Sequence, residues 1–135
     1  MSYKISGSET YYKVQGTESY YKITNVTDRT APVLLSAVIP ADGLSIVLTY
    51  NEALDETSVP IVSDFGISNV AGIVVDSVNI LDDEVTLGIS GGTFTDQDEP
   101  KLYYTAGSNP FQDDYGNECA KITAYNVTNN SEVTP

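Results

Sequence analysis

The chain has 135 residues, of which 41% are hydrophobic, enough for one compact domain with a modest core. Nineteen acidic and six basic residues give a formal charge of −13, so we expect no binding to nucleic acid or to anionic membrane surfaces. The absence of histidine and the presence of one cysteine exclude nucleophiles paired with histidine, imidazole zinc sites and an internal disulfide.

The first 29 residues differ in composition from the rest of the chain. They carry four basic and three acidic residues, whereas residues 30–135 carry two basic and sixteen acidic residues. A nine-residue repeat, Tyr-Lys-[Ile/Val]-x-Gly-[Ser/Thr]-Glu-[Ser/Thr]-Tyr, begins at Tyr3, Tyr12 and Tyr21. Each repeat joins a β-favouring run to a glycine-containing turn. We therefore predict that residues 1–29 form a separate β-repeat arm.

This arm is too short to bury a hydrophobic face by itself, because stacked repeats need about three units or a partner. It also holds five of the ten tyrosines, a residue type typical of contact surfaces. The sequence thus favours an arm that contacts a partner; the alternative is a flexible polar tail. The expected contact residues are its aromatic and aliphatic residues: Tyr3, Ile5, Tyr11, Tyr12, Val14, Tyr20, Tyr21 and Ile23.

From residue 30 onward, short β-favouring runs alternate with turn signals every 8 to 14 residues. This spacing predicts an all-β fold, an immunoglobulin-like β-sandwich of about seven strands over residues 30–130, followed by a flexible tail at 131–135. A helical turn is expected at 51–58. The predicted strands are 33–39, 44–50, 61–68, 72–80, 84–90, 101–105 and 120–127.

Two side chains receive specific interpretations within this body. Cys119 is expected to be a small buried hydrophobic residue, because no second cysteine can pair with it in the chain. Tyr103 and Tyr104 are adjacent on a predicted strand and therefore face opposite ways. We expect one of the two tyrosines to lie in the core and the other on the surface.

Several motifs of the body occur in the order found in a known family. The segment 42–55, DGLSIVLTYNEALD, is followed by a Ser-Val-Pro step at 58–60, and the segment 103–113 reads YYTAGSNPFQD. Over residues 31–128 the sequence resembles bacterial immunoglobulin-like repeats of the SwmB type. The resemblance implies a spacer, decoration or adhesive module of a bacterial surface protein or a phage virion.

The function expected from these features is that of a non-enzymatic phage virion protein, a capsid decoration or cement protein located on the virion surface and made in the host cytoplasm. The expected partners are the major capsid protein or another virion protein, and further copies of the chain, with a trimer of interlaced arms as one arrangement. The alternative is a module of a tail fibre, a head fibre or a bacterial cell surface that binds glycan or a host receptor.

Acidic turns are the remaining feature that could form a site. Oxygen-rich turns suit calcium, but none of them has the spacing of a known calcium loop. The two readings are a structural calcium ion and solvated turn carboxylates without any cofactor. The candidate calcium ligands are Asp96, Asp98, Asp113 and Asp114. Paired carboxylates could serve a glycosidase, yet these acids lie in short turns and no tryptophan offers a sugar platform, so no catalytic residue is assigned.

Overall fold

The computed structural model describes residues 3–6, 9–13, 20–23 and 28–135, the first three segments by their backbone alone. The chain divides into two compact units, Met1–Thr30 and Ala31–Pro135, which we call the arm and the body. In the described residues no helix is long and apolar enough to cross a membrane.

The arm contains a three-stranded antiparallel sheet of order β1-β2-β3. Its strands are β1 (Tyr3–Ser6), β2 (Glu9–Lys13) and β3 (Tyr20–Ile23). Each strand contains a Tyr-Lys or Tyr-Tyr-Lys run of the nine-residue repeat, whose tyrosine and β-branched residues favour extended backbone. Consecutive strands therefore pair as neighbours in a meander.

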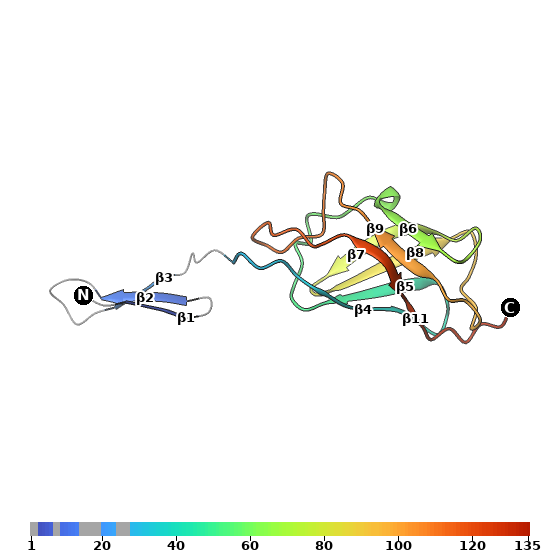
Figure 1. Ribbon diagram of the computed structural model, residues 1–135, viewed down its shortest axis with the longest axis horizontal. Helices are drawn as coiled ribbons and strands as arrows, with labels where there is room; N and C mark the ends of the chain where they lie inside the picture. The colour runs from blue at the N-terminus through green and yellow to red at the C-terminus, as the bar shows by residue number, and fades with distance from the viewer. Residues whose placement is uncertain (1–2, 7–8, 14–19, 24–27) are drawn as a thin grey trace. The chain divides into compact units, whose positions relative to one another are not determined.

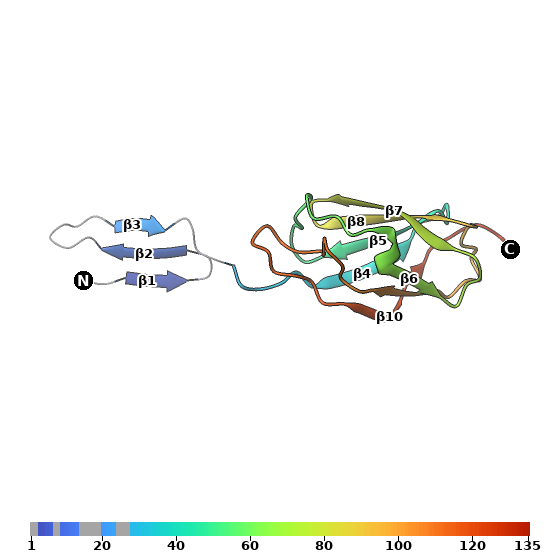
Figure 2. The same cartoon turned by 90° about the horizontal axis from the view of Figure 1, so that it is seen from above.

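The body is a sandwich of two sheets, with the orders β11-β4-β5-β8-β7 and β10-β9-β6. Figure 2 shows β7, β8, β5 and β4 side by side in the larger sheet. This is the arrangement of constant-type immunoglobulin domains, and it confirms the predicted fold class. The strands are β4 (Leu34–Ile39), β5 (Ser45–Tyr50), β6 (Phe65–Ser68), β7 (Val74–Leu81), β8 (Glu84–Ser90), β9 (Lys101–Tyr104), β10 (Ile122–Asn126) and β11 (Thr128–Asn129).

The body has eight strands where about seven were expected, because a further short strand, β11, follows the last predicted one, 120–127. That predicted strand corresponds to β10, which pairs antiparallel with β9, whereas β11 pairs parallel with β4 in the other sheet. A register shift between Ile122 and Tyr125 bends the chain there, and Ala124 has a φ of 48°. One continuous segment therefore joins both sheets at this side of the sandwich (Figure 1).

The hydrophobic core of the body lies between its two sheets. Alternation along β5 buries Ile46, Leu48 and Tyr50 on one face, as the sequence predicts. An aromatic cluster fills one end, where the rings of Tyr104 and Phe111 lie 4.8 Å apart. The core as a whole is formed by body residues from Ala37 to Val127, so the body contains what it needs to fold by itself.

Two local predictions are wrong. The helical turn expected at 51–58 is absent, because its backbone bonds to distant loops: the Leu54 N–H donates to the Asp82 carbonyl oxygen at 2.9 Å. The strand expected at 61–68 begins only at Phe65, because one turn of 3-10 helix, η1 (Val62–Asp64), occupies its first part.

The tail expected at 131–135 is attached to the body over its first residues. The buried Ser131 hydroxyl donates to the carbonyl oxygen of Phe94 at 2.7 Å. The Asp96 N–H donates to the Val133 carbonyl oxygen, also at 2.7 Å. Residues 131–133 therefore close one end of the sandwich.

Candidate functional site

The register of the arm aligns equivalent positions of its repeat. In antiparallel strands, directly opposed residues lie on the same face, as do residues two positions along. One cross-strand row consists of Tyr3, Tyr12 and Tyr21. The next row on the same face consists of Ile5, Thr10 and Ile23.

The rows between these belong to the opposite face of the arm sheet. One of them consists of Lys4, Tyr11 and Lys22. The predicted contact residues are therefore divided between both faces, while Val14 lies outside the described residues. One face thus carries both isoleucines and three tyrosines, whereas the other carries the lysines together with Tyr11 and Tyr20.

In the body, a mainly hydrophobic opening lies between the start of β4 and the segment that leads into β10. We call it the apolar groove. Its volume is about 480 Å³, within the range of ligand-sized clefts. Val33, at its rim, is 54% exposed, and Tyr50, in its lining, is buried. The groove is lined by Pro32, Val33, Leu34, Tyr50, Ala120, Lys121, Ile122, Thr123 and Tyr125. Sequence reasoning missed this groove, because it depends on how the two sheet edges approach each other.

Carboxylates gather at the same end of the body as the apolar groove. Strand pairing shows which loops share this end. Leu34, the first residue of β4, pairs with Tyr50, the last residue of β5. In the other sheet Tyr104, the last residue of β9, pairs with Phe65 and Ile122, which begin β6 and β10. The loops here carry ten of the body's sixteen acidic residues and one lysine, Lys121. We call this end the acidic end. Its acids are Glu52, Asp55, Glu56, Asp64, Asp82, Asp83, Glu84, Asp113, Asp114 and Glu118.

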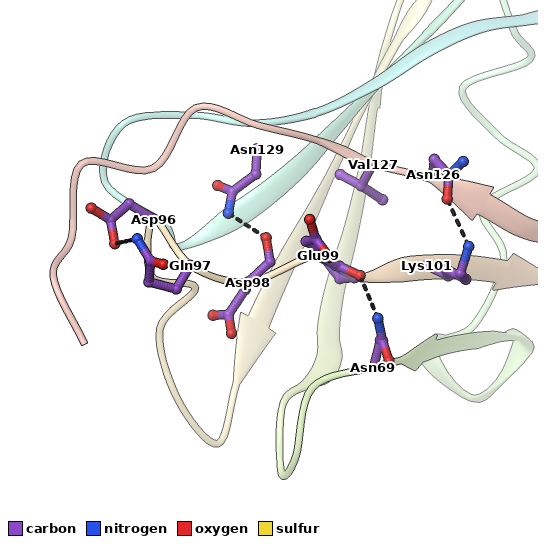
Figure 3. Close-up of a pocket in the computed structure, with 10 residues that line it drawn as sticks. Asn69, Asp96, Gln97, Asp98, Glu99, Lys101, Asn126, Val127 and Asn129 are labelled. Atoms are coloured by element: carbon purple, nitrogen blue, oxygen red, sulfur yellow. Dashed lines mark hydrogen bonds between the residues drawn. The ribbon is translucent and has the colours of Figure 1, made fainter.

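A second, more polar pocket of about 600 Å³ lies at the opposite end of the body (Figure 3). It contains two of the predicted calcium ligands, Asp96 and Asp98. The Gln97 amide donates to a carboxylate oxygen of Asp96 at 3.1 Å, and the Thr95 N–H donates to Asp98 at 2.7 Å. Both carboxylates thus accept hydrogen bonds from their own loop, which is the behaviour of turn-capping acids.

The other two predicted ligands, Asp113 and Asp114, lie at the acidic end, so the structure does not bring the four candidates together. Asp113 is almost fully buried and accepts bonds from the N–H groups of Tyr115 and Asn117, both at 2.9 Å. Burial alone would raise its pKa, but hydrogen bonds from Asn117 and Tyr115 outweigh that effect and lower the pKa.

The carboxylate of Glu52 lies within 4.8 Å of that of Asp113, a neighbour that the sequence did not indicate. Within the body these two residues could offer carboxylate oxygens to a cation, although Asp113 already holds its own turn through several bonds. Six to eight oxygens are usual for calcium. The calcium hypothesis therefore stays a prediction for this pair as well as for the four residues named from the sequence.

The remaining titratable groups in the core are unsuited to nucleophilic chemistry. Burial raises the pKa of the Cys119 thiol to about 12, and that of Tyr104 to about 12. Cys119 is 6% exposed, as expected of a buried hydrophobic residue, whereas activated thiols have a lowered pKa and access to solvent. Tyr104 is fully buried, while Tyr103 lies nearer the surface, as predicted.

Comparison with known proteins adds no neighbour: no family model matches the chain, and neither a curated protein nor a solved structure is significantly similar to it.

Proposed function

We propose that the protein is a non-enzymatic structural component of a larger assembly, in which the arm anchors the chain and the body projects from the attachment point. The setting suggested by the sequence resemblance is the surface of a phage virion, where the protein would act as a decoration or cement protein. The partners would be a capsid protein or neighbouring copies of the chain.

The division between the two units carries this proposal. A sheet buries its hydrophobic face only against another layer, and the described strands of the arm supply one layer. The body has its own core and sixteen of the nineteen acidic residues. A highly charged body resists non-specific association, so specific contact falls to the arm.

Attachment to particles tests this proposal directly. Phage particles prepared from a mutant that lacks the protein would be mixed with the full chain or with residues 31–135, which contain the complete core. After sedimentation, the full chain should be recovered with the particles and the body alone should stay in the supernatant. Equal recovery of both, or of neither, would contradict the proposal.

The polar pocket is the observation that supports the alternative function, binding of a glycan or a receptor by the body. Its amide and carboxylate groups, among them Asn69, Gln97 and Asn126, could bind a hydroxyl-rich ligand. A body that binds glycan or a receptor should retain its ligand after the arm is removed. Binding of residues 31–135 to a glycan array, abolished by substitution in this pocket, would support that alternative instead.

A further inference from the structure

We propose that the apolar groove is a docking site for the arm of a second copy, which adds an edge strand of its sheet between β4 and β10. This inference rests on the proposed function, since it takes the arm to be the contact element, and it names the surface that receives the arm. The mode is strand addition, in which backbone hydrogen bonds supply affinity and alternate side chains enter a groove.

Two sheet edges next to the groove have unused backbone groups. In the described part of the chain, β11 pairs with β4 only at Val38 and Ile39, so the outer edge of β4 is unpaired over its first residues. On the facing sheet, β10 pairs with β9 alone. Such edges are templates for another strand. The arm sheet likewise ends in two edge strands, β1 and β3.

The contact that now crosses the groove is weak. The Tyr125 hydroxyl donates to the Leu35 carbonyl oxygen at 3.4 Å, near the upper limit for a hydrogen bond. Leu35 and Val33 are 59% and 54% exposed, large values for aliphatic residues on a strand. An added strand can replace the long Tyr125 bond with backbone bonds and can cover Val33, which lines the groove. The β-branched residues of the arm, Ile5 and Ile23, suit such a surface.

The distribution of charge favours the arm of a second copy over its body as the occupant of the groove. The groove lies at the acidic end, which carries ten carboxylates and one lysine, although Lys121 is the only charged residue in the lining of the groove. The arm holds four of the six basic residues of the chain and three acidic ones, a balance of +1 against −14 for the body. Lys4 and Lys22 share one row of the arm sheet. A second body would bring further carboxylates to this end and would be repelled, whereas the arm brings lysines. The occupant we infer is therefore the arm of another copy and not its body.

The position of the groove favours a closed assembly. The chain enters the body at Ala31 and Pro32, and Pro32 itself lines the groove. The arm is therefore connected to the body at the end that carries the groove, so two copies can each give an arm and receive one. Such reciprocal exchange saturates both sites in a dimer, and exchange around a three-fold axis does so in a trimer.

The first test compares two valines at opposite edges of the body. Val33→Glu places a charge at the groove, and the control Val74→Glu places the same charge on β7, where the valine is 56% exposed. Sedimentation velocity of the full chain should show a dimer or trimer that Val33→Glu weakens about tenfold or more, while Val74→Glu has an effect of less than about threefold. Equal effects of the two substitutions would overturn the proposal.

The second test locates the added strand and checks the charge argument. Hydrogen exchange should show protection of β10 amides that rises with concentration in the full chain and does not rise in residues 31–135. Lys4→Glu combined with Lys22→Glu should weaken the assembly about tenfold, and salt above about 0.5 M should weaken the wild-type assembly. Unchanged protection of β10 would refute strand addition there.

The outcomes separate this inference from the function on which it rests. If the full chain associates, deletion of residues 1–29 abolishes association, and Val33→Glu has no effect, the arm is the contact element but its acceptor lies elsewhere. If the full chain stays monomeric at high concentration, the exchange of arms is wrong, and attachment to particles alone decides the proposed function.

Discussion

Removal of one hydroxyl group from each of two buried tyrosines should change the stability of the body in opposite directions. The Tyr50 hydroxyl is buried and has no hydrogen-bond partner among the described residues. The Tyr104 hydroxyl accepts a bond from the Phe111 N–H at 2.9 Å. Tyr50→Phe therefore removes an unsatisfied polar group, while Tyr104→Phe leaves a buried N–H without an acceptor.

The size of each effect follows from the cost of an unsatisfied buried polar group, about 1–3 kcal/mol. Tyr50→Phe should raise the free energy of unfolding by about 1 kcal/mol, and Tyr104→Phe should lower it by about 1–3 kcal/mol. In a domain of about 100 residues, 1 kcal/mol moves Tm by about 4–8 °C. The ring packing is retained in both variants, so cavity formation contributes little to either change.

Differential scanning calorimetry of the full chain and both variants measures these shifts, and near-UV circular dichroism shows that the aromatic packing is retained. The two substitutions remove the same atom from the same residue type in one aromatic cluster, so each is a control for the other. A fall in Tm with Tyr50→Phe as large as that with Tyr104→Phe would refute the reasoning, because it would mean that the Tyr50 hydroxyl is satisfied.

Three further predictions concern single residues of the body. The Cys119 thiol should react with a thiol reagent at pH 8 only after unfolding, because with a pKa of about 12 its thiolate fraction is about one in ten thousand; rapid labelling of the native chain would contradict its burial. Because the pKa of Asp113 is lowered in the folded state, its carboxylate should stabilise the fold above about pH 4, the ordinary aspartate value, and this stabilisation should disappear as the pH falls through the lower folded pKa. In urea titrations at several pH values, Asp113→Asn should make the free energy of unfolding depend less on pH. An unchanged pH profile would show that this carboxylate is not responsible. Gly91 and Gly116 both have φ near +84°, but a Cβ at Gly91 would overlap the carbonyl oxygen of Gly72, whereas a Cβ at Gly116 would meet no atom. Gly91→Ala should therefore lower Tm clearly more than Gly116→Ala. Equal losses of Tm would show that the positive φ alone determines the cost.

The sequence predicted most of the body because its strands have regular alternation and clear turn residues. Val85 and Leu87 of β8 are fully buried, as the period-two pattern requires. Leu44 extends the same kind of pattern in the preceding hairpin, yet it is 52% exposed. It lies before the first paired residue of β5, where the chain leaves the turn at Gly43 and the strand's alternation does not yet apply.

The candidate surfaces could not be predicted, since they depend on contacts between distant segments. The loop at 51–58 has residues that favour a helix, but backbone bonds from Leu54 and Asp55 to Asp82 and Gln112 hold it in an irregular path. The apolar groove exists because the strand after Cys119 bends near Ala124 and changes sheets. No local pattern encodes that bend.

The parallel pairing of β4 with β11 determines how the body would respond to tension along the chain. The chain enters through β4 and leaves through β11, so a pull between the arm and the residues after Asn129 drags these two neighbouring strands in opposite directions. The bonds that join them, including that from the Asn130 N–H to the Ile39 carbonyl oxygen at 2.9 Å, are then loaded together in shear instead of being opened one by one. A body attached through its arm would in this way transmit force through its edge strands while its core stays closed.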